Sequence, residues 1–251
     1  YKDDPDDMPY KRTRGRELSL KAREVRPGMI RISGHRKALP KEGWVIYSGG
    51  DSFVDDHRSS PAFRVDRSRD IRIEDVNIHH CGGMGIIAER TENVSLKRFN
   101  VALRPGSGRV TTASADATHF TYCRGLIEME DCLFENMLDD ATNVHGTYVR
   151  VREILDKHTV GVVMGHFQQQ GYTFGEAGDR CGFTREGGSY DPFLEAKLSG
   201  VKKVNKRYYL LSFEKELEGV QAGDLVDNLD WYPEVRITNC TIRNNRARGL
   251  L

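Results

Sequence analysis

Residues 71–78 read Ile-Arg-Ile-Glu-Asp-Val-Asn-Ile, and the spacing of their apolar side chains decides the fold class. The same template, apolar at its first, third, sixth and eighth positions, returns at residues 94–101, 127–134 and 235–242. Within each pair of apolar positions, every second residue is apolar, as in a strand with one inward face. The two residues between the pairs break this alternation, which predicts two short strands that meet at a bend. Four such units predict stacked coils, and therefore an all-β right-handed parallel β-helix.

The template also predicts which residues are neighbours between coils. Its third position should form one inward ladder of Ile73, Leu96, Met129 and Ile237. The loop from Arg104 to Ser114 lengthens the interval between the second and third units. Cys132 and Cys240 share one slot and are expected to be small buried side chains, with a disulfide between them left open.

About ninety residues interrupt the template after its third unit, and they alternate like the strands of a small antiparallel β-barrel inserted into the β-helix. We therefore expect residues 1–146 to hold an N-terminal segment and β-helix coils, 147–230 to hold the barrel, and 231–251 to return to the β-helix. Residues 1–40 are highly charged, and we expect them to be irregular. We also expect the chain to continue beyond both ends. The strands predicted for the insert are 148–151, 160–164, 193–198, 208–211 and 225–226.

Composition excludes several functional classes. The 251 residues have a net charge of +1, which gives no basic field for nucleic acid. No apolar run approaches the 18 or so residues of a membrane-spanning helix. The five cysteines form no C-x-x-C pair, which argues against a zinc site and a disulfide scaffold. Homo-oligomer formation stays open.

The candidate site is a repeated motif: A-D-A-T-H-F at residues 115–120 returns 24 residues later as D-D-A-T-N-V at 139–144. One coil brings Asp116 beside Asp140, and the fourth unit places Arg248 next in that ladder. We expect Asp139 to point away from it. Carboxylates gathered so closely shift one another's pKa values, which is typical of acid–base catalysis or metal binding. An ion-pair ladder or a calcium site is the alternative interpretation.

Neighbouring side chains favour catalysis on a sugar. His119 and His145 supply rings that titrate near neutrality. Tyr122 and Tyr148 are candidates for a surface on which a sugar ring stacks, and Arg104 and Arg248 are candidates for hydrogen bonds to sugar hydroxyls. An inverting glycosidase needs one protonated and one ionised carboxyl group, about 6.5–9.5 Å apart.

Three motifs carry a resemblance to a known family: I-H-H-C-G-G-M-G-I at 78–86, S-A-D-A-T-H-F at 114–120 and D-D-A-T-N-V-H-G-T-Y at 139–148. They resemble glycoside hydrolase family 110, the bacterial α-1,3-galactosidases that include enzymes removing the terminal galactose of blood group B. The resemblance implies a right-handed β-helix with inserted β-barrels, and exo action with inversion on a terminal α-galactoside. It also implies no metal or other cofactor and a secreted or periplasmic location.

The arrangement also resembles that of the polygalacturonases, and this second resemblance implies the roles of the aspartates. Carried over, Asp139 is the acid, and Asp116 with Asp140 forms the base. The chain has Ser-Ala-Asp where polygalacturonases have Asn-Thr-Asp, and it lacks their Arg-Ile-Lys, which argues against a galacturonate substrate. A polygalacturonase-like hydrolase of acidic polysaccharide is therefore kept only as an alternative. A carbohydrate-binding β-helix without activity, as in an adhesin or a tailspike, is the alternative from another class.

Overall fold

The computed structural model describes residues 21–33, 60–165, 169 and 172–251, in two units that divide after His57. β-Strands are the regular elements of these residues, which confirms the all-β class. In the first unit, β1 (Lys21–Arg26) and β2 (Met29–Ser33) pair as an antiparallel hairpin. The expectation that residues 1–40 are irregular is therefore wrong here, because Gly28, with φ of 74°, permits the tight turn.

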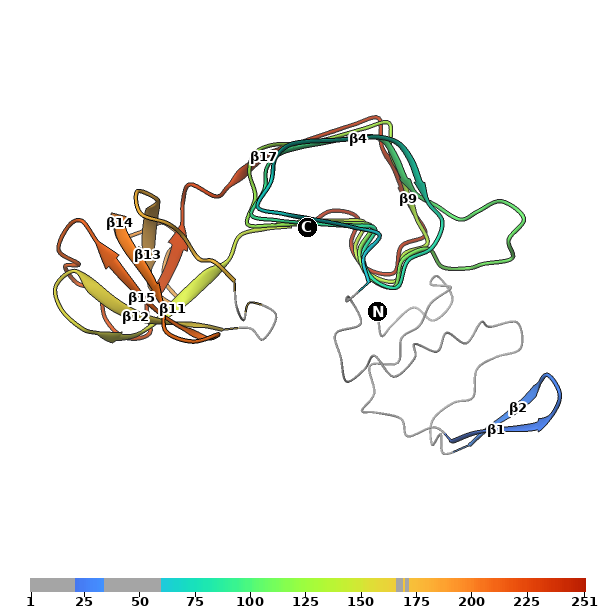
Figure 1. The fold of residues 1–251 in the computed structure, drawn as a ribbon, viewed down its shortest axis with the longest axis horizontal. Helices are drawn as coiled ribbons and strands as arrows, with labels where there is room; N and C mark the ends of the chain where they lie inside the picture. Colours follow the sequence, from blue (N-terminus) through green and yellow to red (C-terminus); the bar gives the residue numbers. More distant parts are fainter. Residues whose placement is uncertain (1–20, 34–59, 166–168, 170–171) are drawn as a thin grey trace. The chain divides into compact units, whose positions relative to one another are not determined.

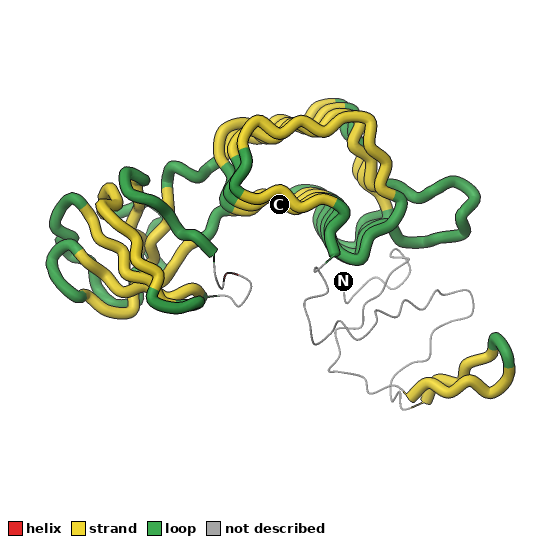
Figure 2. The backbone as a smooth tube through the Cα atoms, in the orientation of Figure 1, coloured by secondary structure: helices red, strands yellow, loops and turns green. Residues whose placement is uncertain are grey.

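Parallel strands build much of the second unit, in residues 60–146 and 233–251, which we call the parallel-strand region (Figures 1 and 2). One sheet has the order β10-β7-β5-β3, and the other has the order β17-β8-β6-β9-β18, with β4 also paired to β6. The first sheet consists of β3 (Phe63–Asp66), β5 (Ile86–Glu89), β7 (Thr118–Thr121) and β10 (Thr142–His145). The second consists of β4 (Arg69–Ile78), β6 (Glu92–Val101), β8 (Arg124–Glu130), β9 (Leu133–Glu135), β17 (Pro233–Thr238) and β18 (Thr241–Arg243).

The observed register confirms the predicted inward ladder. Ile73 pairs with Leu96, Leu96 with Met129, and Met129 with Ile237. Leu96 and Met129 have no exposed surface, as expected for the middle of the core. The predicted bend is also present, because the residue before the template's sixth position has a left-handed backbone in every unit. These residues are Asp75, Arg98, Asp131 and Asn239, with φ of 56°, 49°, 56° and 53°.

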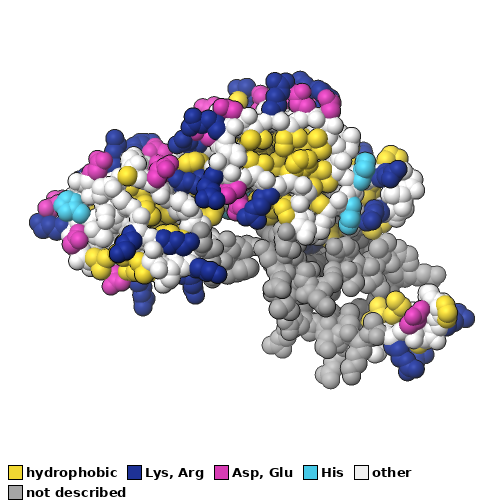
Figure 3. All heavy atoms as spheres, viewed as in Figure 1, with side chains coloured by type: hydrophobic (Ala, Val, Ile, Leu, Met, Phe, Trp, Pro, Cys, Tyr) yellow, Lys and Arg dark blue, Asp and Glu magenta, His cyan; other side chains and the backbone are white. Residues whose placement is uncertain are grey.

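Charged side chains cover the outer face of the second sheet and pair across its strands. Arg98 donates to Asp75, and Lys97 contacts Glu130 at 2.8 Å. Figure 3 shows basic and acidic side chains mixed along the edge of the region where β4 lies, with hydrophobic side chains in the middle of the region. On the inner face Cys132 is a free thiol, and burial raises its pKa to about 11, which fits a structural role.

Residues 148–228 contain a closed six-stranded barrel of order β11-β12-β15-β14-β13-β16. Five of its strands correspond to predicted ones. The prediction missed β13 within a glycine-rich stretch, because its pairing with β14 and β16, rather than its composition, makes it a strand. The strands are β11 (Tyr148–Ile154), β12 (Thr159–Met164), β13 (Arg180–Thr184), β14 (Leu194–Lys203), β15 (Tyr208–Phe213) and β16 (Leu225–Asn228).

Aromatic packing joins the barrel segment to the parallel strands. The Tyr122 ring stacks on Trp231 with centroids 5.7 Å apart, and its hydroxyl donates to the carbonyl of Phe174. The Arg90 guanidinium lies 4.4 Å from the Trp231 ring centroid and donates to the Thr173 carbonyl at 3.1 Å. These contacts place the ends of β5 and β7 beside the barrel segment. The described residues contain no helix that is long and apolar enough to cross a membrane.

Candidate active site

Asp116 and Asp140 occupy equivalent positions in two turns, each two residues before a strand of the first sheet. The Ala117 amide donates to the Asp140 carbonyl at 3.1 Å, and the Ala141 amide donates to the Arg248 carbonyl at 3.0 Å. In both bonds, the residue after an aspartate of the ladder donates to the carbonyl of the next ladder residue. The structure therefore aligns Asp116, Asp140 and Arg248 in the order that the sequence repeat predicts.

The Asp116 side chain is 1% exposed, and both of its carboxylate oxygens have partners. The backbone amide of Asp140 donates to its Oδ1 at 3.3 Å, and Oδ2 lies 2.6 Å from Nδ1 of His119. Two fixed contacts on a buried carboxylate hold it in one orientation.

Asp140 is equally buried, and it forms an ion pair with Arg248. The Arg248 side chain donates to Oδ1 at 3.0 Å through Nε and to Oδ2 at 2.8 Å through a terminal nitrogen, and its backbone amide donates to Oδ1 at 2.8 Å. Such a forked pair fixes both groups. The Arg248 guanidinium is therefore paired with Asp140, which is the ion-pair ladder that the sequence left open beside a role in binding sugar hydroxyls.

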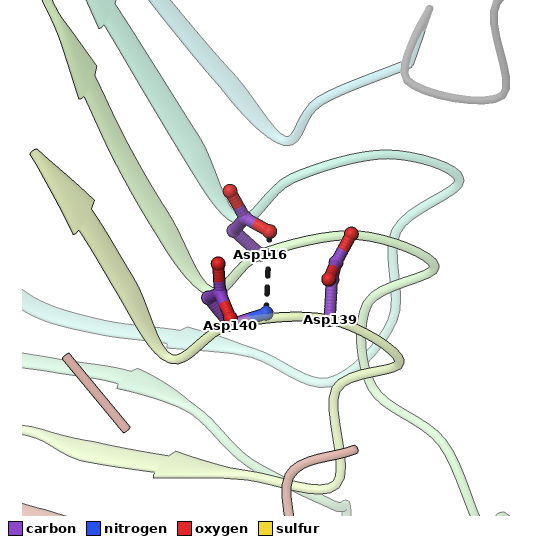
Figure 4. A group of neighbouring side chains, drawn as sticks. All are labelled: Asp116, Asp139 and Asp140. Carbon is purple, nitrogen blue, oxygen red and sulfur yellow. Dashed lines mark hydrogen bonds between the residues drawn. The ribbon is translucent and has the colours of Figure 1, made fainter. Parts of the chain in front are cut away.

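Asp139 is half-buried and lies with the other two carboxylates in one cluster. One oxygen from each of the three lies within 4.8 Å of one from each of the others. Figure 4 shows the three side chains projecting from neighbouring turns toward the same side. The expectation that Asp139 points away from the ladder is thus wrong, because the turn after Leu138 brings its side chain round to Asp116 and Asp140. The nearest-oxygen separation is shorter than the 6.5–9.5 Å expected between the carboxyl groups of an inverting pair.

The two histidines predicted for the site form a contact that the sequence did not indicate. Nε2 of His119 lies 3.0 Å from Nε2 of His145, and Nδ1 of His145 lies 2.8 Å from the Gly146 carbonyl oxygen. The rings meet edge to face, with centroids 5.0 Å apart. His119 is buried against Asp116, whereas His145 is exposed.

Three other predicted residues have different outcomes. Tyr122 is fully buried against Trp231, so its prediction as a surface for a sugar ring is wrong. Tyr148 is 53% exposed at the start of β11, where a ligand can reach it. Arg104 is exposed on its loop. In the described part of the chain, no contact joins Arg104 to Asp116, Asp139 or Asp140.

Two further polar residues were not among the predicted catalytic or sugar-binding residues. Asn143 pairs with His119 in the strand register, and its buried Oδ1 has no hydrogen-bond partner among the described residues. Aligning the two motifs would have found it, since Asn143 follows Asp140 as His119 follows Asp116. Asp227 pairs with Tyr148 across the barrel, accepts a hydrogen bond from Tyr232, and has its pKa raised to about 6 by burial.

The chain is similar to several known proteins. A family model described as GLAA-B beta-barrel domain II matches residues 159–226. The α-1,3-galactosidase A of Shewanella woodyi is 34% identical over 94% of this chain and 38% of its own length. The α-1,3-galactosidase B of Akkermansia muciniphila is 40% identical over 80% of this chain and 26% of its own length. The corresponding protein of Phocaeicola vulgatus is 35% identical over 91% of this chain and 39% of its own.

These relatives are glycoside hydrolases, the class that the clustered carboxylates indicate. The chain belongs to the α-1,3-galactosidase family, glycoside hydrolase family 110. It spans between 26% and 39% of the length of these three relatives.

Proposed function

We propose that this protein is an exo-acting α-1,3-galactosidase that releases terminal galactose from glycans with inversion at the anomeric carbon. The observation that carries the proposal is the cluster of Asp116, Asp139 and Asp140 in a chain of this family. Three carboxylates within reach of one another supply an acid and a base for glycosidic cleavage. Asn143 supplies a buried acceptor beside them that suits a sugar hydroxyl or a bound water.

Fold, domain boundaries and location belong to the same proposal. We infer that the parallel-strand region is a right-handed parallel β-helix and that residues 147–230 form a domain inserted between 1–146 and 231–251. Parallel register between strands about one repeat apart supports the first inference, and the closed barrel supports the second. A secreted or periplasmic location follows from the family resemblance.

The contacts of the carboxylates support distinct roles. A general acid must present a protonated oxygen to the leaving group. Both oxygens of Asp140 accept hydrogen bonds from Arg248, and both oxygens of Asp116 are in contact with neighbouring groups. We assign the acid to Asp139, the more accessible of the three, and the activation of water to Asp116 with Asp140.

Incubation with an α-1,3-linked galactobioside tests the activity, and NMR of the first-formed sugar tests its stereochemistry. We expect free galactose, appearing first as the β-anomer. Binding without release of galactose would instead favour a non-catalytic carbohydrate-binding protein. If the α-anomer appears first, one carboxylate acts as a nucleophile and the base assignment is wrong.

Metal chelation provides a separate prediction. Calcium requires six to eight oxygen ligands, and three aspartates could contribute to such a shell. Because Arg248 and His119 occupy oxygens of Asp140 and Asp116, we expect EDTA to leave the rate of galactose release unchanged. Loss of activity with EDTA that is restored by Ca²⁺, but not by Mg²⁺, would contradict this expectation.

A further inference from the structure

A continuous row of hydrogen-bonding groups leads from the most buried carboxylate to solvent. Oδ2 of Asp116 lies 2.6 Å from Nδ1 of His119, and the two Nε2 atoms of His119 and His145 lie 3.0 Å apart. The row ends where Nδ1 of His145 lies 2.8 Å from the carbonyl oxygen of Gly146. Exposure rises along it, from 1% for Asp116 and 6% for His119 to an exposed His145.

The number of protons in this row follows from its contacts. Each of the three short contacts needs one proton, because two bare acceptors at such distances repel each other. The Gly146 carbonyl only accepts, so the proton in that contact sits on His145. Hydrogen bonds at all three contacts would therefore need three protons, one more than an ionised Asp116 with two neutral imidazoles supplies.

We propose that Asp116, His119 and His145 form a proton relay that carries the proton taken up by the catalytic base to solvent after each turnover. This inference rests on the proposed glycosidase function and assigns to the two histidines a role other than contact with the sugar. His119 and His145 are positioning and proton-transfer residues that act through Asp116.

The relay balances the protons of hydrolysis. Asp139 gives its proton to the leaving oxygen as the glycosidic bond breaks, and the oxygen of water bonds to the anomeric carbon. The proton that water loses enters the row at Asp116, and one proton leaves from His145 to solvent. The row returns to three protons and Asp116 to a carboxylate, while Asp139 takes a new proton from solvent. Without the exit, the buried Asp116 would hold its proton and delay the next turnover.

Charged side chains in the neighbouring turns and strands form ion pairs of their own. Arg248 is bound to Asp140, and Glu89, in the strand next to β7, accepts from Arg64. Among the described residues, Asp116 contacts His119, and Tyr232 lines the same hollow as His145.

The kinetic test replaces the exposed ring. His145→Ala should lower kcat about 10- to 100-fold in dilute buffer, less than the roughly 10²–10⁴-fold of direct proton transfer, with KM little changed. Added imidazole should restore the rate in proportion to its concentration. His145→Gln, which keeps a hydrogen-bonding group but no titrating ring, should show the loss without rescue. His158→Ala removes an exposed histidine of the barrel and serves as the matched control with an unchanged rate.

Two kinetic outcomes would overturn the relay. If His145→Ala raises KM and added imidazole does not restore the rate, His145 contacts the sugar. If kcat of His145→Ala is unchanged, proton release through His145 does not contribute to turnover.

A second measurement does not depend on activity. ¹⁵N NMR of the histidine side chains at neutral pH should show His119 and His145 coupled, with the extra proton on a ring nitrogen or on the Asp116 carboxyl. Two independent neutral rings, with both Nε2 atoms bare, would refute the proton count. If the wild-type protein releases no galactose, the proposed function fails on its own, and the NMR result still decides the proton count.

Discussion

Asp139→Asn should lower the hydrolysis of an α-1,3-galactobioside by about 10²–10⁴-fold, the usual contribution of a general acid. The same variant should lose about tenfold or less on an aryl α-galactoside whose leaving group departs without protonation. The reason is that the amide cannot donate the proton that a sugar leaving group requires. Comparing kcat/KM on the two substrates measures the effect.

Asp116→Asn and Asp140→Asn are the matched controls, because they make the same chemical change within the same cluster. Each should reduce activity to a similar degree on both substrates, since water must be activated whichever group leaves. Equal losses of Asp139→Asn on both substrates would remove it from the acid role. A selective loss in Asp116→Asn or Asp140→Asn would transfer that role to the residue concerned.

Tyr122→Ala should lower the free energy of unfolding by about 3–5 kcal/mol, the usual cost of deleting a large buried ring. Tyr122 is fully buried and packs on Trp231, Tyr172 and Phe174, so its removal leaves a cavity between the parallel strands and the barrel segment. Because a domain is stable by only about 5–15 kcal/mol, this loss is large. Urea denaturation followed by circular dichroism measures it.

Two further variants separate packing from sugar binding. Tyr122→Phe keeps the ring and removes the hydroxyl that donates to the Phe174 carbonyl, which also accepts from Asn228 at 3.3 Å, so the cost should be about 1 kcal/mol with an unchanged KM. Tyr148→Ala truncates an exposed tyrosine and should change stability by about 0.5 kcal/mol or less. A raised KM in Tyr122→Phe, or a loss below about 1 kcal/mol in Tyr122→Ala, would contradict the buried structural role.

The register of the parallel strands follows from the apolar pattern of the sequence alone. A period-2 pattern interrupted by a two-residue step permits one inward face, so the units beginning at residues 71, 94, 127 and 235 align in one way. The alignment of Asp116 with Asp140 and Arg248 follows from this register, because residues in equivalent turns become neighbours even when 108 positions separate Asp140 from Arg248 in the chain. Local periodicity was therefore enough to assemble the ladder.

The directions of the side chains in the turns, and the burial of Tyr122, depend on tertiary contacts instead. The turn conformation brings Asp139 back toward the other carboxylates, and the contact between His119 and His145 depends on rotamers that no spacing encodes. Tyr122 looked accessible beside the motif, but packing against Trp231, more than a hundred residues later, buries it. Strand periodicity specifies which backbone positions are adjacent, whereas side-chain direction and burial depend on contacts between segments distant in the sequence.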